Sequence, residues 1–164
     1  MQSKKLALLK ELNIRASRDA GARSMTSMQL SAAIGCVSPP NVDTAAEFCH
    51  LVNTIARAGG PHEASNLLRD TGTIPVLFAC LRAWPAERRV VYFTCWPLYF
   101  LACYGNEDTK QAIRSVHDLH ELLSAAAASG LEKSKYDGFS AAATVLARLS
   151  VSIPVEPQHT AEEP

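Results

Sequence analysis

This sequence is poor in aromatic residues, carries no excess of either charge and contains no long apolar run. Phe, Trp and Tyr make up only 7% of its residues, a bias that favours closely packed helices over a β-sandwich. Lys and Arg total 16, and so do Asp and Glu, so there is no bulk positive field to attract nucleic acid or an anionic membrane. No apolar stretch approaches the roughly 18–20 residues needed to cross a bilayer. We therefore expect neither nucleic acid nor a membrane as a partner.

The cysteines lack the spacing of a metal site or a redox pair. There are five, an odd number, and none form a C-x-x-C pair. Four of them lie inside apolar runs, which is typical of buried, reduced thiols in an intracellular protein. They are Cys36, Cys49, Cys80, Cys95 and Cys103.

The N-terminal segment bears on where the protein is found. Its apolar run, Leu6 to Leu9, is too short for the hydrophobic region of a secretory signal. The segment is basic and amphipathic, as a mitochondrial presequence is, but Glu11 and Asp19 favour an ordinary first helix. We expect a cytoplasmic protein, with the nucleus as the alternative and a mitochondrial presequence less favoured.

Apolar residues recur at helical spacing along almost the whole chain, and no segment alternates convincingly with period two. With 164 residues, of which 48% are hydrophobic, the chain can bury the core of one domain. In the first helix we expect one apolar face formed by Leu8, Leu9, Leu12 and Ala16. In the second we expect a buried face formed by Met25, Met28, Ala32 and either Ile34 or Val37.

Asparagine, glycine and proline residues mark where the middle helices begin and end. Asn41 or Asp43 is expected as the N-cap of a helix that ends at Gly59, and Asn106 as the N-cap of a short later helix. The segment 87–104 is apolar on nearly every side, which predicts a helix covered on most of its surface. The residues expected to be buried in these and the later helices are Phe48, Leu51, Val52, Ile55, Ile74, Leu77, Phe78, Leu81, Leu119, Leu122, Leu123, Ala126, Phe139, Ala142, Val145, Leu146 and Leu149.

Similar helical segments recur at a regular interval. Ile74 corresponds to Leu119 at an offset of about 45 residues, and periods of about 40–47 with two or three helices per unit are typical of helical solenoids. The segment 72–113 resembles an armadillo repeat running into the next repeat. The matching residues are Gly72, Ile74, Pro75, Leu77, Leu81, Trp96, Leu98, Leu101, Ala102, Gly105, Asn106, Gln111, Ala112 and Ile113. The flanking segments resemble the family more weakly.

The resemblance implies an all-α, armadillo-like α-α superhelix, a right-handed solenoid of about three helical repeats. Residues 1–23 would form an N-terminal capping helix. The repeats would span about 24–70, 71–115 and 116–151, and 152–164 would form a disordered, acidic, proline-containing tail. No single repeat could bury its own apolar faces, so the stacking of repeats would provide the core.

In the armadillo family, the third helices line a groove that receives extended peptides or partner proteins. Carried over by position, the partner-binding residues here would be His50, Asn53, Thr54, Arg57, Arg89, Phe93, Trp96, Phe100, Thr144 and Arg148.

This chain departs from the family at the asparagines that hold a ligand's backbone. Thr54, Phe100 and Arg148 stand in their place, and no acidic run is present to accept a basic localisation signal. The chain is therefore not expected to act as a nuclear import receptor. Trp96 and Phe100 with basic flanks at Arg57 and Arg148 suit an apolar anchor with acidic neighbours. The alternative is that the two aromatic residues fill the core between repeats.

No motif predicts an enzyme. His117 and His120 are three residues apart, whereas a zinc-protease helix needs two histidines four apart, and no third ligand is evident. Phosphate-binding loops and G-x-S-x-G elbows are absent from the sequence. We predict no catalytic residue, metal or cofactor, and no small-molecule ligand. The predicted function is a non-enzymatic adaptor or scaffold that binds a peptide or helix of a partner protein. The alternative is a constitutive structural subunit of a larger intracellular assembly.

Overall fold

The computed structural model describes residues 2–18, 25–37, 41–134 and 139–150, which contain nine α-helices and no strands. The expected tail, 152–164, lies outside these residues, as does the end of the expected capping segment. In chain order the helices are α1 (Gln2–Ala16), α2 (Ser27–Cys36), α3 (Val42–Ala58), α4 (Pro61–Asp70), α5 (Thr73–Ala83), α6 (Arg88–Tyr104), α7 (Glu107–Arg114), α8 (Leu119–Ser129) and α9 (Ala141–Ser150).

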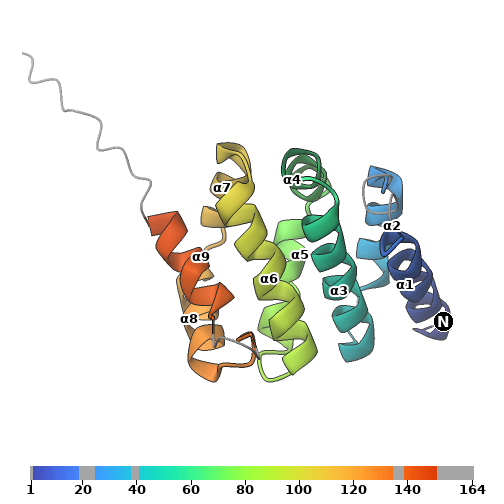
Figure 1. The fold of residues 1–164 in the computed structure, drawn as a ribbon. Coiled ribbons are helices and arrows are strands. Elements are labelled where there is room, and N and C mark those ends of the chain that lie inside the picture. Colours follow the sequence, from blue (N-terminus) through green and yellow to red (C-terminus); the bar gives the residue numbers. More distant parts are fainter. Residues whose placement is uncertain (1, 19–24, 38–40, 135–138, 151–164) are drawn as a thin grey trace, which may run out of the picture.

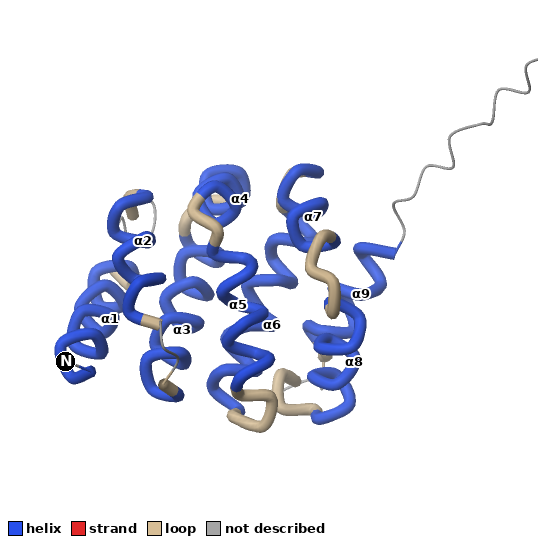
Figure 2. The backbone as a smooth tube through the Cα atoms, turned by 180° about the vertical axis from the view of Figure 1, so that it is seen from behind, coloured by secondary structure: helices blue, strands red, loops and turns tan. Residues whose placement is uncertain are grey.

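Four helices stand side by side in one row. Figure 1 shows α1, α3, α6 and α9 in this order, all running in the same direction, and each packs on the next. The view from behind shows α5 and α8 on the other side of this row (Figure 2). Among the other helices, α4 contacts α7 and α5 contacts α8.

The local signals for helix ends act largely as expected. Asn41 is the N-cap of α3, and its Oδ1 accepts hydrogen bonds from the backbone N–H groups of Asp43 and Thr44 at 3.0 and 3.4 Å. Asn106 likewise caps α7 and accepts from the N–H of Thr109 at 2.9 Å. The polar side chains thus satisfy donors that the first turn of each helix leaves free.

Buried apolar side chains form one continuous core that runs from α1 to α9. The predicted buried residues of α3 and α5 are confirmed, and Phe48 and Phe78 are the largest fully buried side chains. In α8 and α9 most of the predicted residues are buried, whereas Leu122 and Leu146 remain half-buried. In the described part of the chain, no helix combines the length and the apolar character needed to cross a bilayer.

The predicted buried face of α2 is wrong at two positions. Met28 is 79% exposed and Ala32 is also exposed, whereas Leu30 and Ala33 are fully buried. The apolar residues of this helix are spread around its axis, so their spacing does not single out one face; packing on α1 and α3 selects it. A smaller correction concerns α1, where Leu8 is exposed while Leu9 and Leu12 are buried.

Candidate partner-binding face

One stripe of α6 concentrates the aromatic side chains of this aromatic-poor chain. Its residues recur at i, i+3 and i+4 spacing, which places them on one side of a helix. None of the rings in the stripe is fully buried. We call this stripe, with the two rings that meet it from neighbouring segments, the aromatic face: Tyr92, Phe93, Trp96, Tyr99, Phe100 and Tyr104 on α6, with His50 on α3 and Phe139 before α9.

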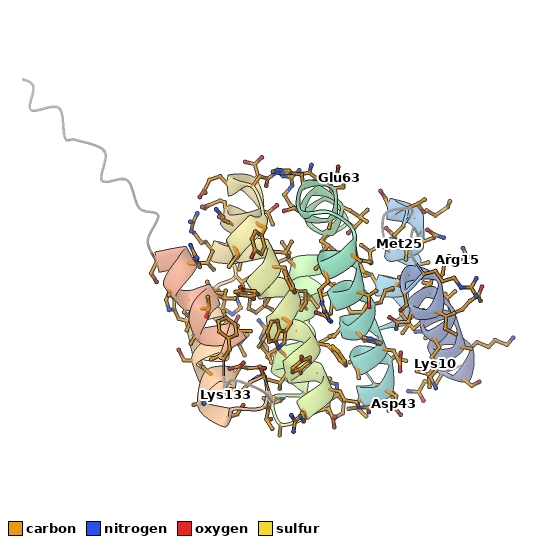
Figure 3. The ribbon with its side chains drawn as sticks, viewed as in Figure 1. Lys10, Arg15, Met25, Asp43, Glu63 and Lys133 are labelled. Carbon is orange, nitrogen blue, oxygen red and sulfur yellow. The ribbon has the colours of Figure 1, made fainter. Side chains whose placement is uncertain are left out.

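The rings of the aromatic face contact one another in an unbroken chain. His50 lies against Phe93 with ring centroids 4.6 Å apart. Trp96 is the centre of the chain, 5.8 Å from Phe139 and 6.3 Å from Phe100, and Tyr104 stacks beyond Phe100. Aromatic pairs contribute about 0.5–1.5 kcal/mol each beyond area burial, so these contacts hold the rings in place without a ligand. Figure 3 shows ring side chains crowding this side of α6.

Trp96 belongs both to the surface and to the core. Its indole Nε1 donates a hydrogen bond to the backbone carbonyl of Glu132 at 3.1 Å, and its ring remains half-buried. A buried indole N–H needs such a partner. Trp96 thus joins α6 to the segment between α8 and α9, and part of its surface stays open.

Glu132 is a fully buried carboxylate in the segment between α8 and α9. Its Oε1 accepts from the Ser140 hydroxyl at 2.6 Å and its Oε2 from the Ala141 N–H at 3.1 Å. These donors lie at the N-terminus of α9, where the helix dipole favours a negative charge. Glu132 therefore fixes the start of α9 next to the aromatic face.

One exposed cationic side chain borders the aromatic face, and another lies on the adjoining helix α9. Arg57 is exposed and, with Phe100 and Tyr104, lines a mostly apolar pocket of about 340 Å³ between α3, α4 and α6. Arg148 is exposed on α9. Neither makes a hydrogen bond or ion pair within the described ranges, so both guanidinium groups remain available to an acidic partner.

Other residues predicted to bind a partner already have internal roles. Arg89 donates to Asp43 at 3.0 Å and contacts Glu87 at 3.4 Å. The hydroxyls of Thr54 and Thr144 donate to the backbone carbonyls four residues earlier, those of His50 and Ser140.

Asn53 is only 5% exposed, and its Oδ1 meets no donor among the described residues. An acceptor buried in this way costs free energy unless a partner reaches it.

Half of the residues of the aromatic face were not predicted from the sequence. Tyr92, Tyr99, Tyr104 and Phe139 were not predicted as site residues, although Tyr92 and Tyr99 lie four residues before and three after Trp96. That helical spacing alone could have identified them. Phe139 could not be identified in this way, because only the chain reversal between α8 and α9 brings it to Trp96.

Most of the cysteine thiols are buried, and burial suppresses the reactivity of Cys49 and Cys95. Four cysteines are buried, as predicted, and Cys103 is half-buried. Burial, with a smaller contribution from the charge of Glu132, raises the pKa of Cys95, and burial likewise raises that of Cys49. Among the described residues, His, Cys, Asp and Glu nowhere gather in a group of three suited to a metal ion.

Comparisons with known proteins do not identify a family. No family model matches the chain, and no curated protein or solved structure matches it.

Proposed function

We propose that this chain is a non-enzymatic protein-interaction module, a short armadillo-type α-α superhelix that binds a peptide or helix of a partner protein across the aromatic face. The observation that carries the proposal is the connected set of partly exposed rings, with the exposed Arg57 at its border and the exposed Arg148 on the adjoining helix α9. Aromatic and Arg side chains are enriched in interface cores, and a chain with so few aromatic residues has gathered most of them here.

Three side-chain bonds between helices at similar sequence offsets support the stacked arrangement. Thr94 donates to Cys49, Arg89 to Asp43 and Ser65 to Thr109, pairs that are 45, 46 and 44 residues apart. This spacing agrees with the repeat length of about 45 inferred from the sequence, and solenoid units contact only their neighbours. The central helix α6 is covered by α3 on one side and α9 on the other.

The partner segment expected here carries an aromatic or aliphatic anchor next to acidic residues. The anchor would enter the pocket beside Phe100 and Tyr104, and the acidic groups would meet Arg57 and Arg148. Such charge complementarity raises association rates and sets the orientation of the partner.

Selection of a random peptide library on the immobilised chain tests this proposal. Selected peptides should combine an apolar anchor with Asp or Glu, and Arg57→Glu together with Arg148→Glu should weaken their binding by about tenfold or more. Lys4→Glu, an exposed charge reversal on α1, should leave it unchanged. Equal binding by all three proteins would refute the proposal. Trp96 is a poor choice for this test, because its hydrogen bond to Glu132 couples it to the fold.

A constitutive structural subunit is the second candidate, and exposed apolar residues at the α1–α2 end favour it. Met28 and Ile14 are the most exposed large apolar side chains of the described residues. An apolar end of this kind suits permanent docking. Sedimentation equilibrium separates the two candidates: a monomer across micromolar concentrations supports the adaptor, and concentration-dependent association supports the subunit.

A further inference from the structure

A second groove lies between α1 and α3, away from most of the predicted site residues. It has a volume of about 530 Å³ and is open to solvent. Its lining includes Lys10, Asn13, Ile14, Arg18, Glu47 and His50, of which only His50 belongs to the predicted site. The sequence predicts α1 only as a cap, whereas Figure 1 shows it in the row formed by α3, α6 and α9.

The side-chain oxygen of Asn13 lacks a hydrogen-bond partner among the described residues, whereas its side-chain nitrogen has two. Asn13 is 6% exposed, and its Nδ2 donates to the Glu47 carbonyl at 2.9 Å and to Glu47 Oε2 at 3.0 Å. Both of these oxygens can only accept, so the orientation of the amide is fixed by chemistry. Its Oδ1 therefore points away from Glu47, and no donor reaches it from the described residues.

A buried carbonyl oxygen without a donor is unfavourable, and native proteins leave few of them. Asn13 lines the groove, and its Oδ1 is closed to solvent in the free protein, so an incoming N–H group reaches it only when the neighbouring side chains shift. A backbone amide of an extended peptide is such a donor, because it is free of internal hydrogen bonds.

The charged residues around Asn13 indicate that the ligand of this groove is negatively charged. Lys10 and Arg18 make no ion pair within the part of the chain that the structure describes, and Figure 3 marks Lys10 on α1. The one carboxylate in the lining, that of Glu47, already accepts from Asn13. Ile14, 61% exposed, adds an apolar surface.

We propose that the groove between α1 and α3 binds an extended acidic peptide segment whose backbone N–H donates to Asn13 Oδ1 and whose carboxylates meet Lys10 and Arg18. The inference rests on the proposed function and extends it, since His50 joins this groove to the aromatic face through its contact with Phe93. A bound segment would then run from α1 toward α6.

Nuclear magnetic resonance of isotope-labelled protein tests this inference at the atom concerned. The probe is a ten-residue peptide library with Glu fixed at two positions and the other positions random, added at millimolar concentration. The side-chain 13Cγ signal of Asn13 should move, because its oxygen gains a hydrogen bond. The 13Cγ signal of Asn41 should stay, because its oxygen already accepts from two backbone N–H groups. A library with Lys in place of Glu should have a much smaller effect on Asn13.

Variants separate this inference from the proposed function. Lys10→Glu with Arg18→Glu should reduce the shift of the Asn13 13Cγ signal caused by the Glu library roughly fivefold or more. Arg57→Glu with Arg148→Glu should leave most of that shift unchanged. If the Glu library shifts signals of the aromatic face and not those of Asn13, the inference is wrong and the proposed function stands. An equal response of Asn13 to both libraries would also overturn the inference, as would no response at all, the result expected if water satisfies Oδ1.

Discussion

Replacement of Glu132 by Ala should destabilise the protein far more than the loss of any exposed carboxylate. Glu132 is fully buried and accepts from the Ser140 hydroxyl and the Ala141 N–H at the start of α9. Truncation leaves both donors without an acceptor and removes the charge that complements the dipole of α9. The carbonyl of residue 132 that holds Trp96 remains, but the segment carrying it loses its attachment to α9.

The magnitude follows from these two hydrogen bonds. Hydrogen bonds to a charged group contribute about 1.5–3 kcal/mol each, and the interaction with the helix dipole adds about 0.3–1 kcal/mol. Because relaxation and entering water recover part of this, we expect the free energy of unfolding to fall by about 2–4 kcal/mol. At about 2–4 °C per kcal/mol for a domain of this size, the Tm should fall by roughly 5–15 °C.

Thermal unfolding followed by circular dichroism measures this loss, and tryptophan fluorescence in a Trp84→Phe background reports the environment of Trp96. Glu132→Gln keeps one accepting oxygen without the charge and should lose about half as much. Glu121→Ala, an exposed carboxylate on α8, is the matched control and should change stability by less than about 0.5 kcal/mol. If Glu132→Ala unfolds at the temperature of the Glu121 variant, the buried carboxylate does not stabilise α9 and the reasoning fails.

Three further predictions test other parts of the structure. Arg82 donates two hydrogen bonds of 2.7 Å to Asp118 and lowers the pKa of that carboxyl. Asp118→Asn should therefore lower the Tm at pH 7. The difference in Tm between this variant and the original protein should shrink as the pH falls from about 3.9 through the lower pKa of Asp118 in the folded state. A Tm difference that stays the same across this pH range would contradict the prediction. When the native protein is treated with iodoacetamide, the half-buried Cys103 should be alkylated first. Mass spectrometry measures the rate at each cysteine, and equally fast modification of the buried cysteines would contradict the prediction and show that the core opens readily. Gly60 has φ +86°, so Gly60→Ala should lower the free energy of unfolding by about 1–2 kcal/mol. Gly35 lies in a helix with open space around a new methyl group, so Gly35→Ala should raise the free energy of unfolding by up to about 1 kcal/mol. Chemical denaturation measures both changes, and equal effects of the two substitutions would refute the strain at Gly60.

The candidate site was predictable from the sequence only in part. His50, Trp96 and Phe100 were predicted from the resemblance to the armadillo family, and the structure gathers them into the aromatic face. Asn13 and Glu132 were not predicted, because polar residues of α1 and of a connecting segment have the composition of solvated surface. Each is buried only because a helix distant in sequence packs against it.

By itself, the sequence determined that the chain is helical, where most of its helices begin and end, and which residues form the central core. Helical periodicity, asparagine caps and glycine stops act within a few residues, so their effect can be inferred without knowing the fold. Only the tertiary structure decided which face of α2 is buried, that α1 borders a groove, and that Trp96 is hydrogen-bonded to Glu132. These features depend on contacts between segments far apart in the chain, and local spacing carries no information about such contacts.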